Sequence, residues 1–293
     1  MIEPISLPVW LTFALLAGSV CAVWLPARWK VSTIPAWALL FVSAVVAGLL
    51  SGCLRWPALA WLGLFVFSTA IAGQPSARPA WRYGGLAATV VLALALAMHK
   101  LPGFANPVLF SNVRLSGGAA AFTQYLNFDK GAVGLILLAM LCRRVDSAEA
   151  RREAMRIAVA ATIATCVLVF PIAMLAGYIH PAFKFGTAIL VFLFANLFFT
   201  CIAEEAFFRG LLQERLSHWL RDRPHGAVAA AGLSALLFGA AHLAGGALYA
   251  ALATVAGAGY ALAYAASRRI ESPIAAHIAF NAAHVLFFTY PHL

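Results

Sequence analysis

The stretch Thr200-Cys-Ile-Ala-Glu204-Glu205-Ala-Phe-Phe-Arg209-Gly210 places three ionisable side chains inside a long apolar run of the sequence. Glu205 and Arg209 are four residues apart, so they share one face of a helix in the favourable acid-before-base order. Glu204 points about 100° away around the same helix and can face a different neighbour. Each unpaired charge near the middle of a membrane costs about 3 kcal/mol on insertion scales. Residues this costly predict a membrane-spanning helix that carries a functional site.

The rest of the sequence has the composition of a membrane protein. Of its 293 residues, 63% are hydrophobic and 10% are charged, whereas a soluble domain carries about 25% charged residues. Apolar runs that are long enough to span a bilayer are separated by Pro, Gly and charged clusters. The runs cover residues 7–25, 34–54, 56–73, 83–98, 126–142, 155–179, 185–212, 227–243, 247–266 and 273–290. The sequence therefore predicts an all-α fold, a polytopic transmembrane helical bundle of about 8–10 spans.

The basic residues indicate which connections between the runs share a side of the membrane. If the chain alternates sides, the odd-numbered connections with the run ends beside them hold 14 of the 20 Lys and Arg residues, the even-numbered ones with their run ends hold 5, and Arg209, inside a run, is counted with neither. The 14 are Arg28, Lys30, Arg78, Arg82, Arg143, Arg144, Arg151, Arg152, Arg156, Arg215, Arg221, Arg223, Arg268 and Arg269, and the 5 are Arg55, Lys100, Arg114, Lys130 and Lys184. By the positive-inside rule the side with 14 is cytoplasmic, and both termini lie outside. The lipid bilayer, with an anionic leaflet, then suffices as the partner of the +10 net charge, and no nucleic acid is required.

Cysteines and small residues are explained by packing. The cysteines lie in or at the ends of apolar runs without Cys-x-x-Cys spacing, which argues against an extracellular disulfide framework. They are Cys21, Cys53, Cys142, Cys166 and Cys201. Small residues at four-residue spacing predict a ridge for close helix packing. The ridge residues are Ala253, Gly257, Ala261 and Ala265.

Two further apolar runs carry polar groups that a membrane interior should exclude. The eighth run ends in Phe238-Gly-Ala-Ala-His242, and the tenth holds His277-Ile-Ala-Phe-Asn281-Ala-Ala-His284. His277 and Asn281 share a helix face, which His284 extends by another turn. The tenth run closely follows a basic connection, so we expect the site nearer the cytoplasmic face.

The seventh and eighth runs can bring two of these groups together. In an antiparallel hairpin about residues 221–225, Glu204 and His242 would lie side by side at the same depth. Each residue alone has a simpler explanation: Glu205 and Arg209 can form a structural ion pair, and a lone histidine can satisfy a hydrogen bond between helices. Together, on three runs and at one depth, they predict a site.

The missing motifs restrict the chemistry of such a site. The sequence has neither Gly-x-Ser-x-Gly nor the His-Glu-x-x-His of a helical zinc protease. Ser234, two turns before His242, is a weak candidate for a serine nucleophile. A carboxylate beside a histidine, such as Glu204 beside His242, activates water as a general base. A second histidine and an asparagine can donate hydrogen bonds to a developing oxyanion, which completes a set for hydrolysing an amide.

At these residues the sequence resembles the CAAX protease and bacteriocin-processing family, also called the abortive-infection family. Its relatives include the type II CAAX prenyl endopeptidase, and the family consists of glutamic intramembrane proteases. The family pattern is Glu-Glu-x-x-x-Arg, then Phe-x-x-x-His, then His-x-x-x-Asn on successive helices, and all three occur here in order within residues 204–281. The resemblance implies an all-helical membrane bundle with a conical polar cavity.

The resemblance also implies roles for individual residues. The catalytic ones are Glu204 and His242, which would activate water, and His277 and Asn281, which would stabilise the oxyanion. The supporting ones are Glu205, Arg209 and Phe238. No cofactor is implied, but earlier descriptions treat the family as metalloproteases. Zinc therefore stays an alternative, with His242, His277 and Glu204 as conceivable ligands.

The expected function is that of an intramembrane endopeptidase that hydrolyses a peptide bond of a membrane-associated protein or peptide. We expect a multi-pass integral membrane protein, located in the plasma (inner) membrane if the source is bacterial. A non-catalytic, peptide-binding or immunity-type member of the same family is the alternative. A polytopic transporter is a weaker one, because the sequence shows no inverted repeat of interrupted spans.

The first half of the chain departs from the minimal family core, which needs fewer spans. We expect residues 1–125 to form an N-terminal transmembrane region with a broken or re-entrant segment near 101–125. Residues 126–293 are expected to form the CAAX-protease-like catalytic transmembrane core. The segments 101–107 and 125–130 contain Pro-Gly, Asn-Pro and charged residues. A structural role and a role in substrate gating both remain open for them.

Overall fold

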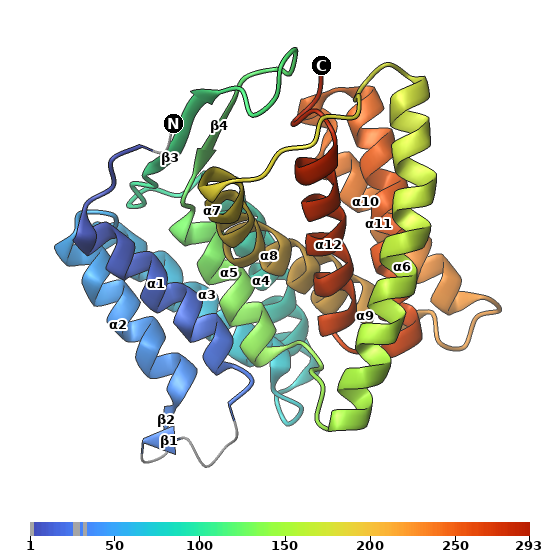
Figure 1. Cartoon of the computed structure of the whole chain (residues 1–293). Coiled ribbons are helices and arrows are strands. Elements are labelled where there is room, and N and C mark those ends of the chain that lie inside the picture. Colours follow the sequence, from blue (N-terminus) through green and yellow to red (C-terminus); the bar gives the residue numbers. More distant parts are fainter. Residues whose placement is uncertain (1–2, 26–29, 32–33) are drawn as a thin grey trace. The chain divides into compact units, whose positions relative to one another are not determined.

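The computed structural model describes residues 3–25, 30–31 and 34–293, and this part of the chain is mainly helical (Figure 1). Arg28 and the side chain of Lys30, which the charge count includes, lie outside the described part. The helices are α1 (Leu7–Ala22), α2 (Ala36–Leu50), α3 (Trp56–Gly73), α4 (Pro79–Ala97), α5 (Phe128–Met140), α6 (Ala148–Leu175), α7 (Thr187–Asn196), η1 (Leu197–Cys201), α8 (Ile202–Glu205), η2 (Ala206–Gln213), α9 (Glu214–Trp219), α10 (Gly226–Ala241), η3 (Leu243–Gly245), α11 (Ala247–Ser267) and α12 (Glu271–Phe287). Every apolar run predicted above overlaps at least one of these helices.

Local signals explain several helix starts. Prolines occupy the first turns of α1, α3 and α4, where a missing N–H is no loss. The Ser147 hydroxyl caps α6 by accepting from the Ala150 N–H at 3.1 Å. Two short strand pairs accompany the helices: β1 (Lys30–Val31) with β2 (Ile34–Pro35), and β3 (Val108–Val113) with β4 (Phe122–Tyr125).

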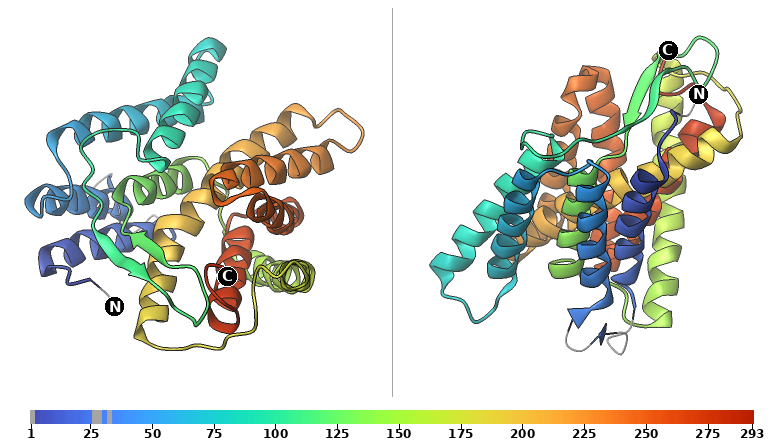
Figure 2. Two further views of the ribbon diagram at one scale, coloured as in Figure 1. Left: turned by 90° about the horizontal axis from the view of Figure 1, so that it is seen from above. Right: turned by 90° about the vertical axis from the view of Figure 1, so that its left-hand side faces the viewer.

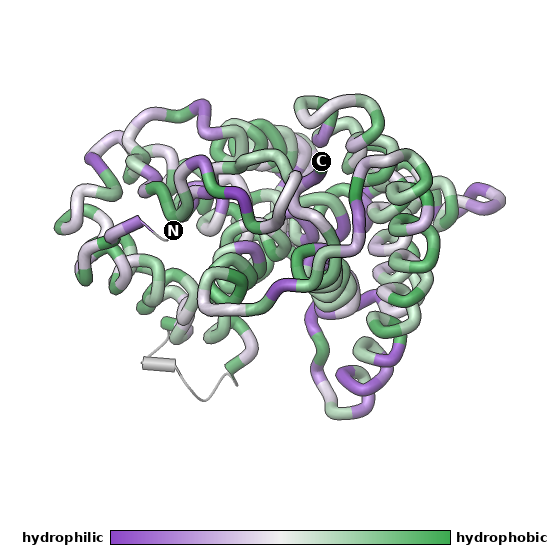
Figure 3. Tube along the Cα trace, turned by 45° about the horizontal axis from the view of Figure 1, so that its top comes forward, coloured by the Kyte–Doolittle hydropathy of each residue, from purple (hydrophilic) through white to green (hydrophobic). Residues whose placement is uncertain are grey.

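Five helical segments in the described residues are long and apolar enough to cross a membrane: α3, α4, α6, the continuous stretch Thr187–Trp219, and α11. Helices α1, α2 and α10 are shorter but also apolar. Figure 3 shows hydrophobic residues along the helices and hydrophilic ones in many of the connections. The prediction of an all-α, polytopic helical bundle is confirmed.

The chain divides into two compact units that are not continuous in sequence. The first comprises residues 1–111, 123–141 and 198–203, and the second comprises residues 112–122, 142–197 and 204–293. In the first unit, the Phe13 ring meets the rings of Phe128 and Phe199 edge-on, at 6.2 and 5.3 Å between centroids. Gly134 lies against the Ala203 backbone, where a Cβ would be 2.9 Å from the Ala203 nitrogen.

Within the first unit, the segments around residues 101–107 and 125–130 meet at one buried carboxylate. Asp129 is 1% exposed; its Oδ2 lies 2.7 Å from His99 Nδ1, and its Oδ1 accepts from Asn106 Nδ2 at 3.0 Å. Asn106 Oδ1 in turn accepts from the Phe128 N–H, at the start of α5. These bonds tie the end of α4 and the following loop to α5, which gives both segments a structural role.

The second unit packs α6, α10, α11 and α12 side by side, as the two views of Figure 2 show. Glycines allow two of the close approaches. A Cβ on Gly239 would lie 1.8 Å from Thr254 Oγ1, and a Cβ on Gly259 would lie 2.1 Å from Thr165 Oγ1. Gly239 belongs to the motif Phe238-Gly-Ala-Ala-His242, so it brings that motif close to α11.

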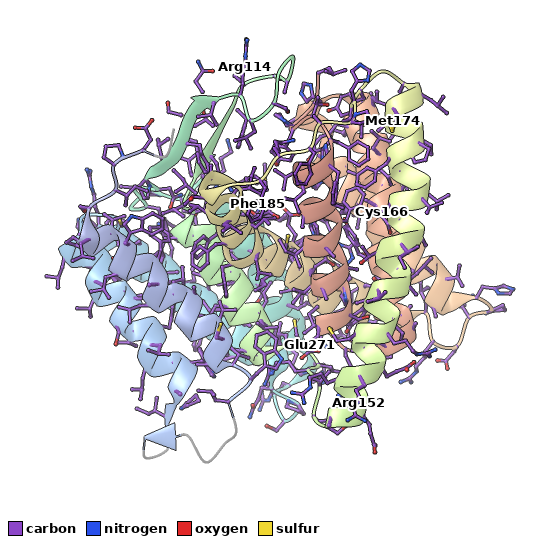
Figure 4. All side chains as sticks on the ribbon, in the orientation of Figure 1. Arg114, Arg152, Cys166, Met174, Phe185 and Glu271 are labelled. Carbon is purple, nitrogen blue, oxygen red and sulfur yellow. The ribbon has the colours of Figure 1, made fainter. Side chains whose placement is uncertain are left out.

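The connections of the second unit gather at its two ends. Figure 4 shows Arg152 and Glu271 toward one end of α6 and Met174 toward the other. At the first end the contacts are Arg269 Nη1 to Arg144 O (2.8 Å), Arg269 Nη2 to Asp146 Oδ2 (3.0 Å), Ile270 N to Arg143 O (3.0 Å) and Val145 N to Glu271 Oε1 (2.9 Å). At the second end they are His180 N to Thr289 Oγ1 (3.0 Å), Leu293 N to Tyr178 O (3.0 Å), Tyr290 N to Ser116 Oγ (3.2 Å) and Ala120 N to His292 O (2.8 Å). This grouping agrees with the predicted alternation of the fourth, fifth, sixth and ninth connections and the C-terminus.

Candidate active site

The helical stretch Thr187–Trp219 contains two π-helical segments, η1 and η2, on either side of the four-residue α8. π-Helical turns are rare and often occur at functional sites. Both glutamates lie in α8, and Arg209 lies in η2. The predicted hairpin with α10 is present: the rings of Phe208 and Phe238 lie 5.2 Å apart, and Ser234 Oγ donates to the Phe208 carbonyl at 3.0 Å.

Glu205 is the meeting point of two motifs. Its Oε1 accepts from Arg209 Nη1 at 3.1 Å and lies 2.8 Å from His277 Nδ1. Glu205 and Arg209 are fully buried, and His277 is 5% exposed. The predicted ion pair on one helix face is therefore present, and it extends to α12.

Arg209 is held by a backbone carbonyl and three aromatic rings. Its Nη2 donates to the Gly257 carbonyl at 2.8 Å, and its Cζ lies 4.6 Å from the Phe238 ring centroid. The rings of Phe208 and Tyr260 lie 5.8 and 5.5 Å away. Cation–π contacts and a charge-assisted hydrogen bond offset part of the desolvation of a buried guanidinium.

The ridge of small residues on α11 lies beside η2, the segment that carries Arg209. Ala253, Gly257 and Ala261 are buried, which agrees with the predicted close packing. One turn beyond Arg209, Gln213 Nε2 donates to the Ala261 carbonyl at 2.8 Å. Two carbonyls of the ridge, those of Gly257 and Ala261, therefore accept hydrogen bonds from Arg209 and Gln213. The members of each pair are four residues apart on their helix.

His242 is oriented by its own helix. Its Nδ1 lies 2.7 Å from the Phe238 carbonyl oxygen, which can only accept, so Nδ1 carries the proton. In the neutral ring the lone pair then resides on Nε2. The ring also lies 4.6 Å from that of Phe238 and 5.4 Å from that of Tyr249. Phe238 thus contacts both Arg209 and His242, which fits a supporting residue.

Glu204 is half-buried and lies outside the Glu205–Arg209 hydrogen bond. Its charge interacts electrostatically with Tyr249 and with Arg209. Tyr249, whose ring contacts that of His242, thus lies within the electrostatic range of Glu204. Ser234, the alternative nucleophile, is fully buried and donates to a carbonyl, so its position does not favour that role.

His277 lies in an aromatic environment on α12. Its ring stacks on Tyr260 at 4.5 Å with an angle of 16° between the planes, and Phe238 meets it edge-on at 5.8 Å. Because Glu205 accepts at Nδ1, that nitrogen carries a proton. If Nε2 is also to donate a hydrogen bond, the ring must be an imidazolium, with Glu205 as its counter-charge.

Asn281 is bonded to Asn196, which lies outside the three motifs and is not among the predicted site residues. Its Nδ2 donates to Asn196 Oδ1 on α7 at 2.9 Å, and Asn196 is 7% exposed. The signal was present in the sequence, since Asn196 is a polar residue within an apolar run. Among the described residues, no group of three or more His, Cys, Asp or Glu side chains is arranged to hold a metal ion.

Comparison with protein families identifies the segment that carries these residues. Residues 186–283 match the family described as type II CAAX prenyl endopeptidase Rce1-like, a family of proteases. Comparisons with curated proteins and with solved structures gave no match. The matched segment contains all three motifs together with Asn196 and Tyr249. With its apolar spans and this match, the chain is a multi-pass integral membrane protein whose residues 186–283 are similar to the CAAX protease family.

Proposed function

We propose that the chain is a glutamic-type intramembrane endopeptidase that cleaves a peptide bond of a membrane-associated protein or peptide. The observation that carries this proposal is the bonding of Glu205 to both Arg209 and His277. This bonding commits one of the two adjacent glutamates to holding the site together. It leaves the water-activating role to Glu204, on a different face of the helix.

Glu204 and His242 activate the water in this proposal. With Nδ1–H bonded to the Phe238 carbonyl, the lone pair of His242 is on Nε2, which accepts a hydrogen bond from water. Glu204 takes a proton from the water as the oxygen attacks the peptide carbonyl carbon. The protonated Glu204 then returns this proton to the leaving amine as the C–N bond breaks. No metal or other cofactor enters these steps, and zinc remains an alternative to be tested.

His277 and Asn281 stabilise the oxyanion. Hydrogen-bond donors fixed in a low-dielectric site contribute most when charge develops on the carbonyl oxygen. Asn281 supplies an amide N–H, and His277 supplies Nε2–H as an imidazolium. Glu205 and Arg209 support the oxyanion-stabilising residues. Glu205 is the counter-charge of the His277 imidazolium, and Arg209 holds Glu205 in place.

The test compares the full chain with its Glu204→Gln variant in two assays. The first uses lipid vesicles and a synthetic peptide that ends in S-farnesylated Cys-Val-Ile-Met, because the matched family is named for prenylated CAAX substrates. The second compares membrane proteomes and looks for precursors that accumulate in a Glu204→Gln strain. We expect accumulation in the variant strain and loss of cleavage in the variant protein. No cleavage by wild type and no accumulated precursor would instead favour the peptide-binding alternative.

A further inference from the structure

The amide groups of Asn196 and Asn281 form a direct hydrogen bond between α7 and α12. Asn281 Nδ2 donates to Asn196 Oδ1 at 2.9 Å, and Asn196 is 7% exposed. Asn196 belongs to none of the three motifs and lies two helical turns before Glu204. A buried amide in an apolar span is costly unless it is bonded, so this bond has both an energetic and an orienting effect.

The orienting effect follows from the chemistry of an amide side chain. The oxygen of Asn281 only accepts, whereas its nitrogen carries two hydrogens about 120° apart. An acceptor on one side of the group therefore fixes the nitrogen on that side. A flip about the last torsion would turn the Asn281 oxygen toward the position of the oxyanion. That arrangement would repel the developing negative charge instead of stabilising it.

Aromatic packing holds α7 and the end of α12 together close to Asn196. The ring of Phe192, one turn before Asn196, meets the Tyr290 ring at 4.9 Å and the Phe122 ring at 6.2 Å. Tyr290 follows the end of α12 and also contacts His284 at 5.1 Å. The hydrogen bond between the two amides is thus formed between helices that are already held together by other contacts.

We propose that Asn196 is a positioning residue that fixes the amide of Asn281 with its nitrogen toward the substrate oxyanion. One hydrogen of Asn281 Nδ2 binds Asn196 Oδ1, and the second is presented to the reacting carbonyl. This inference rests on the proposed function, since it requires Asn281 to stabilise the oxyanion.

The test is a double-mutant cycle on cleavage of the farnesylated peptide by the full chain in vesicles. Asn196→Leu replaces the accepting amide with an apolar side chain of similar size. We expect kcat to fall about tenfold with KM unchanged. Asn281→Ala should lower kcat by roughly 10²–10³-fold. Because Asn196 acts through Asn281, adding Asn196→Leu to Asn281→Ala should change kcat less than about twofold. A multiplicative loss in the double variant, or a change confined to KM, would overturn the inference.

Phe192→Leu is the control for general loosening of α7 against α12. It should lower the melting temperature and leave kcat nearly unchanged, and a loss of kcat equal to that of Asn196→Leu would assign the effect to packing. Wild-type kcat in Asn281→Ala refutes the oxyanion role in the proposed function. If kcat falls in Asn281→Ala but stays at the wild-type value in Asn196→Leu, only the role of Asn196 is refuted. No cleavage by wild type and no precursor in the Glu204→Gln strain refute both.

Discussion

Glu205 Oε1 lies 2.8 Å from His277 Nδ1, although the two residues are 72 positions apart in the chain. The same oxygen accepts from Arg209 at 3.1 Å, so one buried carboxylate joins η2 to α12. A buried carboxylate that is bonded to both a guanidinium and an imidazole affects both the stability of the fold and the charge state of His277. The sequence pattern alone assigns it only to Arg209.

Glu205→Gln is expected to reduce both stability and turnover. The substitution keeps the size of the side chain but removes the charge that balances Arg209, which is fully buried. Breaking a buried ion pair in this way costs about 3–5 kcal/mol, so the melting temperature should fall. His277 also loses its counter-charge, so kcat should fall as well, with little change in KM. Thermal unfolding and steady-state kinetics on the farnesylated peptide measure the two effects.

Gln213→Leu is the matched control for Glu205→Gln. Gln213 is also fully buried and polar on η2, but within the described part of the chain its hydrogen bond goes to the Ala261 carbonyl and not to a catalytic candidate. We expect a lower melting temperature with kcat within about twofold of wild type, because only a neutral hydrogen bond is lost. If Glu205→Gln behaves in the same way, the proposed link between Glu205 and His277 has no role in catalysis.

Glu204→Gln should abolish turnover while the protein stays folded and still binds the peptide. Glu204 lies outside the Glu205–Arg209 bond, so losing its charge leaves that network intact. If Glu204 and His242 act as one unit on the same water, removing both should cost little more than removing either. Single-turnover rates of Glu204→Gln, His242→Ala and the double variant test this. Wild-type turnover in Glu204→Gln would contradict the assignment of the base.

The helices and the short-range pairs were predictable because their signals are local. Apolar runs give the spans, and a spacing of four residues gives the Glu205–Arg209 pair. Contacts between distant segments have no such periodic signal. The bonds from Glu205 to His277 and from Asn281 to Asn196 depend on how α7, η2 and α12 pack. The sequence also does not reveal the π-helical turns around α8, since no residue pattern distinguishes them from an apolar α-helix.

The loops also depend on contacts between distant segments, which the sequence does not predict. The composition of segments 101–107 and 125–130 marks them as unusual, but their structural role depends on Asp129, which accepts hydrogen bonds from both of them. Asp129 is an acidic residue near the start of an apolar run, where charged residues are common. Only the tertiary structure shows that it is buried and bonded to His99 and Asn106.

Strong chelation is expected to leave peptide cleavage unchanged. The described residues contain no group of three or more His, Cys, Asp or Glu side chains arranged to hold a metal ion, and the sequence lacks the His-Glu-x-x-His of a helical zinc protease. Full-chain protein should therefore keep its activity in EDTA and 1,10-phenanthroline, and elemental analysis should give well under one equivalent of zinc. Inhibition by a chelator that added zinc reverses would establish the metal alternative.

The connection between α5 and α6 is expected to be cytoplasmic, and the C-terminal Leu293 to be external. The physical reason is the excess of basic residues, 14 against 5, on the connections that include this one. Within the second unit, the Arg144–Arg269 contact joins this connection to the one before α12, while Leu293 bonds to Tyr178 at the other end. Reporter fusions at Ala150 and after Leu293, of a type active on only one side of the membrane, should therefore give opposite signals. A fusion within the turn at Arg268 should match the one at Ala150. Equal signals at Ala150 and Leu293 would require an even number of crossings between them, and the alternation of spans would be wrong.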